Sequence, residues 1–385
     1  MKKQLLLFVM ALGLSVPVFA QTKTDSTKTT DEEPPLDFSE FGGDIQVSTS
    51  TLNDGVKRYC TSKVFGISPT KLISLSYDYQ LGFDMKANNM ANPATSNLDT
   101  YSETQKVSSM HGLRFIANFP VISKNSLTVN LGATYMESNY QFANPASAMQ
   151  SGLTRSLNAA ALRSTGINIT VFKPLNEKTF LLFQTSHDLN GDYRLGEFQS
   201  LGLLKHSALA VFGWRKHDRL QWGLGVSRTY RVGALNYIPI ILYNYTSENR
   251  KWGIEAVFPA KAAYRRSFSP RSILLFGYEL EGNSYALRNR SIYNGNFNEL
   301  AFEKPMPHEL ELRRSEMRIR LTYERALYQF VWLSVQAGLR YNWRNSYNID
   351  MGDSFRSFFS NDPYHYSNTA TNPMYFQIGI NLVSP

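Results

Sequence analysis

The run Lys71-Leu-Ile-Ser-Leu-Ser-Tyr-Asp-Tyr-Gln-Leu-Gly-Phe-Asp84 alternates apolar with polar or glycine residues from Ile73 to its end. From Ile73 on, one parity, which includes Tyr77 and Phe83, is wholly apolar or aromatic, and the other, which includes Asp78, is polar or glycine. Successive side chains of a β-strand point to opposite faces, so the run predicts a strand with one apolar and one polar face. A tilted strand of about 9–11 residues spans a bilayer. The stretch therefore predicts a transmembrane strand with lipid on one side and a polar lumen on the other.

The composition of the whole chain is typical of many such strands. Of 385 residues, 43% are hydrophobic, 13% are aromatic and only 18% are charged. The mean hydropathy of −0.30 resembles that of a soluble protein. A barrel gives this value because every lipid-facing residue is followed by a lumen-facing one. The aromatic-rich and charge-poor composition favours a membrane barrel over a soluble α/β enzyme.

The N-terminus has the features of an export signal. Lys2 and Lys3 precede a largely apolar run over 4–19, and a small-residue cleavage site ends at Ala20. Residues 1–20 are therefore predicted to form a cleaved signal peptide. No later stretch is long and apolar enough for a transmembrane helix. The exported chain therefore either stays soluble outside the inner membrane or lies in the outer membrane as a closed barrel.

The segment after the signal peptide has little to bury. Residues 21–41 are rich in Thr, Lys, Asp, Glu and Pro, which predicts a disordered periplasmic linker, and the barrel is predicted over 42–385. The chain has one cysteine, Cys60, so no internal disulfide holds the exported protein together. We expect Cys60 to be a small residue on a strand.

The net charge of +9 favours partners that carry negative charge. Nucleic acid is excluded, because the basic residues are scattered singly and export separates the chain from that partner. Lipids of the outer membrane and lipopolysaccharide are the expected partners, with the barrel-assembly machinery during biogenesis. The oligomeric state stays open at this point.

Alternating segments recur along the chain and predict an antiparallel up-and-down barrel of about sixteen strands, with twelve to fourteen possible if short strands merge. The expected strands lie at about 43–52, 56–66, 71–85, 113–119, 127–135, 167–172, 179–189, 207–214, 220–230, 238–246, 252–258, 262–268, 274–281, 316–324, 331–342 and 374–382. Long polar connections alternate with short ones, which predicts long extracellular loops and short periplasmic turns. A short helix is expected at 156–163 within one long loop.

Aromatic, glycine and proline residues punctuate the middle of the chain. They occur in Trp222-Gly-Leu-Gly-Val226, Tyr237-Ile-Pro-Ile240, Trp252-Gly-Ile-Glu-Ala-Val-Phe-Pro259, Tyr264, Gly277 to Gly282 and Tyr285. These motifs and their order between Ile167 and Leu287 resemble those of an uncharacterised family of Gram-negative outer-membrane β-barrels, classed as a domain of unknown function. The resemblance extends more loosely over most of the mature chain. It implies a barrel in the outer membrane and implies no catalytic residues.

Catalytic and metal chemistry have weak signals in this sequence. Ser186-His187-Asp188 contains the residue types of a hydrolase triad, but neighbours on a strand point to opposite faces and do not share a site. His111 and His187 lie near strand ends, where a lipid-modifying enzyme would collect its catalytic groups. The other histidines lack the spacing of metal ligands. We therefore predict no enzyme activity, no cofactor and no metal, and leave a role for His111 or His187 open.

The most informative polar residues are the charged ones that share the lumen parity. They are Arg114, Glu255, Arg265, Glu279, Glu281, Glu316, Arg318, Arg320, Glu324 and Arg340. An arginine on the lipid face would cost about 2–4 kcal/mol at the bilayer midplane, so these residues fix the register. Rings of charge in a water-filled lumen select solutes. The alternative is a lumen closed by ion pairs that serve stability.

Together these patterns predict a Gram-negative outer-membrane barrel of the channel or transport type with a charged lumen. Two alternatives stay open, a lipid-modifying outer-membrane enzyme such as a lipase or acyltransferase, and a structural or surface-binding barrel that uses its loops. The sequence does not specify the substrate.

Overall fold

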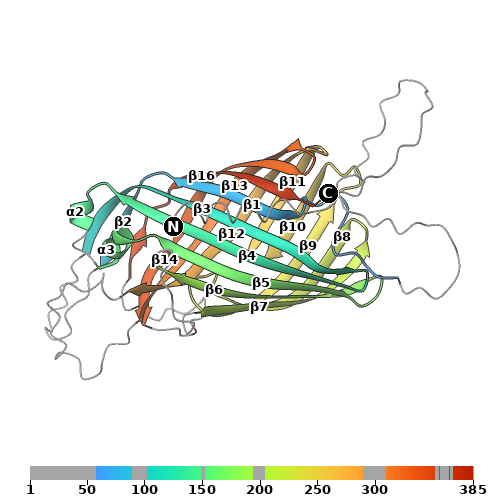
Figure 1. Ribbon diagram of the computed structural model, residues 1–385, viewed down its shortest axis with the longest axis horizontal. Helices are drawn as coiled ribbons and strands as arrows, with labels where there is room; N and C mark the ends of the chain where they lie inside the picture. The colour runs from blue at the N-terminus through green and yellow to red at the C-terminus, as the bar shows by residue number, and fades with distance from the viewer. Residues whose placement is uncertain are drawn as a thin grey trace, which may run out of the picture. The chain divides into compact units, whose positions relative to one another are not determined.

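The computed structural model describes residues 58–88, 102–148, 152–193, 204–288, 309–351, 355, 364 and 367–384. These residues are mostly β, and their strands form one closed antiparallel sheet (Figure 1). The predicted signal peptide, the predicted linker over 21–41 and the predicted strand over 43–52 lie outside the described residues.

The elements follow one another as strands with two short helices in one connection. The first half contains β1 (Lys71–Gln80), β2 (Phe83–Asn88), β3 (Ser102–Lys124), β4 (Leu127–Phe142), α2 (Pro145–Ala148), α3 (Gly152–Ala159), β5 (Leu162–Pro174), β6 (Thr179–Gly191) and β7 (Leu204–His217). The second half contains β8 (Leu220–Thr229), β9 (Asn236–Thr246), β10 (Trp252–Phe258), β11 (Lys261–Ser269), β12 (Ser272–Arg288), β13 (Glu309–Tyr328), β14 (Val331–Met351), β15 (Thr369–Ala370) and β16 (Met374–Val383). The predicted helix forms as α3, about four residues earlier than expected.

The sheet closes because its first and last strands pair with each other. Tyr77 of β1 lies opposite Leu113 of β3 on one side and opposite Ile378 of β16 on the other. β1 and β2 are two parts of one barrel strand, and so are β15 and β16. The described residues therefore form a closed barrel of 14 strands, which confirms the predicted all-β barrel and falls within the predicted range of twelve to sixteen.

The count is lower than sixteen partly because the chain before β1 does not form the predicted strand over 56–66. Its described part has no ladder pairing. Instead, the Cys60 amide donates to the Asn176 carbonyl at 3.0 Å, and the Phe65 amide donates to the Asp218 carbonyl at 2.9 Å. The segment thus bonds across the short β5–β6 and β7–β8 connections, at the end of the barrel that we call the turn end.

The outside of the barrel is apolar, as the alternation predicts. Large apolar side chains that remain exposed include Leu75, Tyr77, Leu113, Phe115, Leu131, Ile167, Ile169, Leu224, Phe276, Leu321, Ile378 and Ile380. The residues between them, such as Ser76 and Asp78 on β1, are buried inside. An apolar exterior on a closed sheet, in which each barrel strand pairs with a neighbour on both sides, is the arrangement that a bilayer requires.

Phe83 is a correction to the predicted orientation. The alternation places it on the lipid face, but its side chain is only 4% exposed and faces the interior. The strand breaks at Leu81–Gly82 and resumes as β2 with the opposite parity, so Phe83 and Met85 point inward. A Cβ on Gly82 would lie 3.0 Å from the Ser108 carbonyl oxygen, so glycine permits the close approach to β3 at this break.

The connections at the other end, which we call the loop end, are mostly long, as predicted. The connection between β10 and β11 is an exception, because it contains only Pro259 and Ala260. The connection between β8 and β9, over 230–235, is also short. The strands β8 to β11 are therefore short, and the wall that they form extends less far toward the loop end. The longer strands β3, β4 and β12 to β14 form the part of the wall that extends furthest, which we call the high part.

The high part of the wall closes on itself. Ala286 of β12 pairs in parallel with Gly191 of β6, and the Asp192 amide donates to the Ala286 carbonyl at 3.2 Å. A Cβ on Gly191 would lie 2.9 Å from the same oxygen, so this contact needs glycine. At this level β12 lies directly beside β6, so the five strands β7 to β11 no longer form part of the wall. Only nine of the fourteen described barrel strands therefore surround the loop end. A tube of about this size is narrow enough for side chains to fill.

Apolar side chains fill this narrow tube. The loop-end cluster consists of Phe83, Met85, Ala87, Val107, Met110, Tyr140, Phe142, Ala148, Leu153, Leu157, Leu162, Tyr285, Leu287, Leu310, Leu312, Tyr347 and Ile349. α2 and α3 contribute Ala148, Leu153 and Leu157, and the Ser156 hydroxyl of α3 donates to the Asp192 carboxylate at 3.0 Å. Figure 1 shows both helices at this end beside β2. In the described ranges, no helix has the length and apolar character that a membrane crossing requires.

The outward parity of β13 can be tested at Leu321, which is 46% exposed between two inward residues. We expect Leu321→Arg to lower the free energy of unfolding from lipid vesicles by about 2–4 kcal/mol, because it places a guanidinium in the hydrocarbon. Val121→Arg, near the β3–β4 turn, is the control and should cost only about 0–1 kcal/mol. Denaturant titration in vesicles measures both values, and equal costs would contradict a lipid-facing Leu321.

The burial of Cys60 can be tested by alkylation. Its side chain packs with Phe172 and Phe180 at the turn end, and burial raises the pKa of the thiol, although the nearby Arg215 opposes this shift. Because the thiolate is the reactive form, a raised pKa lowers the reactive fraction at neutral pH. We expect slow maleimide labelling of the folded protein and fast labelling in urea. Glu177→Cys in a Cys60→Ser background, on the exposed β5–β6 turn, should label quickly in both, and equally fast labelling of native Cys60 would refute its burial.

Candidate functional site

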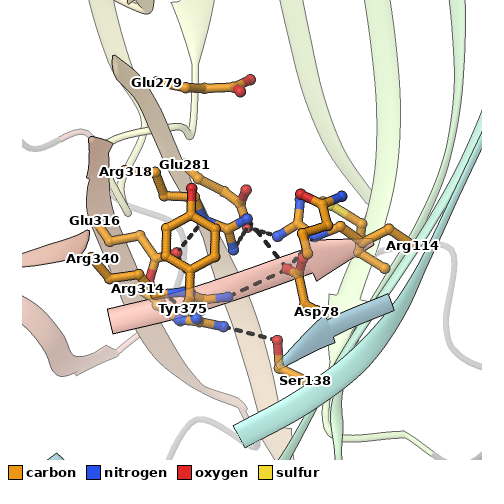
Figure 2. Close-up of polar contacts among 12 residues, drawn as sticks. Asp78, Arg114, Ser138, Glu279, Glu281, Arg314, Glu316, Arg318, Arg340 and Tyr375 are labelled. Carbon is orange, nitrogen blue, oxygen red and sulfur yellow. Dashed lines mark hydrogen bonds and ion pairs between the residues drawn. The ribbon is translucent and has the colours of Figure 1, made fainter. Parts of the chain in front are cut away.

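Arg318 of β13 is the centre of a charged cluster inside the barrel. Its Nε lies 2.7 Å from Glu316, its Nη2 lies 2.7 Å from Glu281 of β12, and its Nη1 lies 3.3 Å from Asp78 of β1. Figure 2 shows these side chains converging from their strands. One guanidinium thus joins carboxylates of three strands, and its planar fork of donors suits such sharing.

Three further arginines complete what we call the ion-pair network, which consists of Asp78, Arg114, Glu281, Arg314, Glu316, Arg318 and Arg340. Arg340 of β14 lies 3.3 Å from Asp78 and 3.4 Å from Glu316. Arg114 of β3 contacts Glu281 and lies 2.6 Å from Asp78. Arg314 lies 3.1 Å from Glu316 and donates to the Ser138 hydroxyl of β4 at 3.1 Å.

Tyr375 of β16 adds an aromatic surface to the network. The Arg318 and Arg340 guanidinium groups lie 5.2 and 5.0 Å from the centre of its ring. Its hydroxyl accepts a hydrogen bond from Gln336 at 2.7 Å. Two cation–π contacts on one ring offset part of the repulsion between two neighbouring arginines.

The network crosses the narrowed tube from wall to wall. Arg114 lies on β3 and Glu281 lies on β12. Four barrel strands separate β3 from β12 in the wall, namely β13, β14, the strand made of β15 and β16, and the strand made of β1 and β2. In the nine-stranded part of the barrel these two strands lie roughly opposite each other. The network therefore forms a charged level directly below the loop-end cluster. β13 shows the change most clearly, since its inward side chains run from Leu310 and Leu312 to Arg314, Glu316 and Arg318.

The ten charged residues predicted for the lumen fall into four groups. The ion-pair network contains Arg114, Glu281, Glu316, Arg318 and Arg340, and Glu279 with Arg320 forms an adjacent pair at 2.7 Å. Glu324 lies at the turn end, 2.5 Å from Lys71. Glu255 and Arg265 pair at 2.9 Å elsewhere in the wall. The structure thus brings five of the ten together and separates the other five.

The Glu255–Arg265 pair holds the chain that enters the barrel before β1. The Glu255 carboxylate accepts hydrogen bonds from the Ser68 amide at 2.9 Å and from its hydroxyl at 2.8 Å. Arg215 of β7 donates to the Lys63 carbonyl at 2.9 Å and to Thr61. Hydrogen bonds from side chains of the barrel wall therefore hold the segment 58–70 across the turn end.

Three members of the site are absent from the predicted set. Asp78 stands on the polar parity of the opening stretch, and Arg314 continues the alternation of Glu316 and Arg318 two residues earlier. The predicted β13 strand starts too late to include Arg314. Tyr375 alternates with the outward Met374 and Phe376, so the sequence predicts that its side chain points inward. Nothing in the sequence predicts its contacts with Arg318 and Arg340.

The histidines that the structure describes do not form a catalytic group with Ser186 and Asp188. The Ser186 hydroxyl donates to the Asp188 carboxylate at 3.0 Å, and both alternate with His187 on β6. His187 instead contacts His206 of β7, with 2.7 Å between their Nδ1 atoms. His111 packs against Tyr77 on the outward parity. Among the described side chains, no three His, Cys, Asp or Glu groups lie close enough to hold a metal ion.

Some polar atoms of the network are buried without a hydrogen-bond partner among the described residues. They include Oδ1 of Asp78 and Nε of Arg314 and of Arg340. Buried polar atoms in proteins are nearly always bonded to protein or to water. The network therefore retains hydrogen-bonding capacity for water or for a polar solute.

The energetic role of the network can be tested at Asp78. We expect Asp78→Asn to lower the free energy of unfolding by about 3–5 kcal/mol, because it leaves buried guanidinium groups with too few carboxylates. Glu248→Gln is the control, since it breaks the exposed Arg219–Glu248 pair at a turn and should cost less than about 1 kcal/mol. Denaturant titration of both variants decides the matter, and similar small losses would show that the network adds little stability.

Comparison with known proteins gives one family and several solved structures. The NanC porin is 6% identical, with 78% of this chain and 100% of that chain covered and a TM-score of 0.31. The toluene transporter TodX of Pseudomonas putida is 9% identical, with 85% and 95% covered and a TM-score of 0.30. An outer-membrane channel of Pseudomonas putida F1 is 9% identical, with 86% and 100% covered and a TM-score of 0.32. No curated protein sequence matches the chain.

The family model confirms the resemblance that the aromatic and glycine motifs suggest. It covers residues 79–383, which is most of the chain. The chain belongs to the family described as a domain of unknown function (DUF6268).

Proposed function

We propose that this protein is an outer-membrane β-barrel of the channel or transport type, with a path that the ion-pair network and the loop-end cluster close. The apolar exterior supports a place in a lipid bilayer. The predicted signal peptide and the alternation of long and short connections support the outer membrane of a Gram-negative bacterium. Its lipids and lipopolysaccharide are then the immediate surroundings of the barrel.

The single observation that carries the channel proposal is the charged level inside the barrel. A barrel that served only as a membrane anchor would be filled at lower cost by apolar side chains, because buried ion pairs seldom exceed the stability of a hydrophobic replacement. Here seven charged side chains cross the interior, and some of their polar atoms have no hydrogen-bond partner within the part of the chain that the structure describes. Such a constriction suits the passage of polar solutes.

The charge of the network supports a preference among solutes. It contains four guanidinium groups, from Arg114, Arg314, Arg318 and Arg340, against the carboxylates of Asp78, Glu281 and Glu316. One positive charge remains in excess. We therefore expect an open form of the channel to pass anions more readily than cations.

A second candidate function is a permanently closed structural barrel. The loop-end cluster favours it, because seventeen buried apolar side chains occupy the tube above the network. The two candidates differ in whether the interior opens when its closing elements are weakened. Part of the loop-end cluster comes from α2 and α3, which belong to a connection and not to the wall.

Conductance of four proteins in planar bilayers separates the candidates. They are the natural chain, Arg114→Gln with Glu281→Gln, a chain with a short Gly-Ser linker in place of residues 144–160, and the combination. The paired substitution removes the wall-to-wall contact without changing the net charge of the network. If the barriers act in series, we expect each change alone to give small increases and the combination to give the largest conductance, with anion selectivity by reversal potential.

The exposed pair supplies the matched control. Arg219→Gln with Glu248→Gln removes one ion pair at a turn and should leave the conductance of the natural chain unchanged. Circular dichroism and heat-dependent migration verify that each barrel is folded. If all folded variants, including the combination, fail to conduct, the channel proposal is wrong and the structural barrel remains.

A further inference from the structure

A hollow lies on the outer wall of the barrel at the turn end. Its volume is about 520 Å³, and we call it the rim pocket, lined by Ser269, Arg271, Ser272, Tyr323, Arg325, Ala326 and Leu327. It forms where the β11–β12 turn meets the end of β13. The Ala326 amide donates to the Arg271 carbonyl at 2.9 Å, and Ser272 pairs with Arg325 across the strands. Ladder hydrogen bonds therefore fix its floor.

The two arginines of the rim pocket have no acidic partner among the described residues. The arginines of the ion-pair network each lie within 3.4 Å of a carboxylate, and Arg219 at another turn lies 3.0 Å from Glu248. Arg271 and Arg325 instead line the same hollow, and both are exposed. Two cations on one small hollow repel each other unless an anion joins them.

The neutral groups of the pocket are hydroxyls. The Ser272 hydroxyl donates to the Tyr323 hydroxyl at 3.0 Å, and the Ser269 hydroxyl accepts from the Arg271 amide at 3.2 Å. Guanidinium forks with nearby hydroxyl groups are the combination that recognises a phosphate group, whose oxygens accept several charge-assisted hydrogen bonds.

The surroundings favour a phosphate that carries acyl chains. Tyr323 and Leu321 extend from the pocket along the apolar wall. Leu327, which also lines the pocket, and the next residue Tyr328 are 60% and 65% exposed. Aromatic residues at this level are typical of the boundary between headgroups and hydrocarbon. A lipid held here would place its phosphate between the arginines and its chains along the wall.

We infer that the rim pocket binds the phosphate of an anionic phospholipid of the leaflet that surrounds the turn end. This inference rests on the proposed position of the barrel in a membrane. It does not depend on conductance. Because the pocket lies outside the wall and the ion-pair network lies inside, each proposal can fail alone.

Native mass spectrometry of the purified full-length chain tests the inference. The probes are phosphatidylglycerol and phosphatidylcholine in mixed micelles, and inorganic phosphate alone. We expect one phosphatidylglycerol to be retained, with about tenfold or greater loss of affinity in Arg271→Gln with Arg325→Gln, and weaker retention of phosphatidylcholine. Lys124→Gln with Lys251→Gln, which removes two exposed cations from other turns, should bind as the natural chain does.

The remaining outcomes overturn the inference. Equal retention of phosphatidylglycerol by the arginine variant, or equal loss in the lysine control, would mean that general surface charge attracts the lipid. Binding of inorganic phosphate without retention of lipid would make the pocket a site for free anions. A folded arginine variant, verified by circular dichroism, is required for each comparison, and Arg271→Lys with Arg325→Lys should recover only part of the affinity because lysine lacks the planar fork.

Discussion

The contacts of Arg318 with Asp78, Glu281 and Glu316 are the interaction on which the interior depends. A guanidinium in the middle of a barrel is stable only when carboxylates surround it, because water no longer solvates its charge. The three carboxylates come from β1, β12 and β13, so the ion pairs also fix the distance between strands that are far apart in the sequence. They mark the level at which the interior changes from polar to apolar.

The narrowing of the barrel explains why this level is closed. Fourteen strands enclose a space that side chains alone do not fill, whereas eight or nine enclose one that they do. The contact of Ala286 with Gly191 removes five strands from the wall at the loop end. Apolar side chains then pack across the tube above the network, and α2 and α3 add to them. At the turn end, the segment 58–70 is fastened by Glu255 and Arg215. The charged level thus lies between the loop-end cluster, which excludes solvent, and the fourteen-stranded part of the barrel whose end the segment 58–70 crosses.

The inside and outside of the wall present positive charge in different ways. Inside, arginines are paired with carboxylates, and the excess is a single charge spread over the network. Outside, Arg271 and Arg325 share one hollow with hydroxyl groups and no carboxylate among the described residues. The difference follows from the solvent on each side. A buried cation must have its partner within the protein, while a cation at a membrane boundary can take its partner from a headgroup.

The sequence by itself determined the class of fold and the direction of most side chains. Alternation along Lys71–Gln80 or Met374–Val383 has one physical meaning, because only a two-residue period puts apolar groups on one face of a strand. The ten inward charges followed from the same period, and Asp78 and Arg314 share it. The two-residue alternation does not continue through a break in a strand. The inward direction of the Phe83 side chain therefore depends on the break at Leu81–Gly82, where Gly82 lies close to β3. Only the tertiary structure decided which charged side chains meet and that β12 contacts β6. These contacts join strands far apart in the chain and depend on the curvature of the closed sheet.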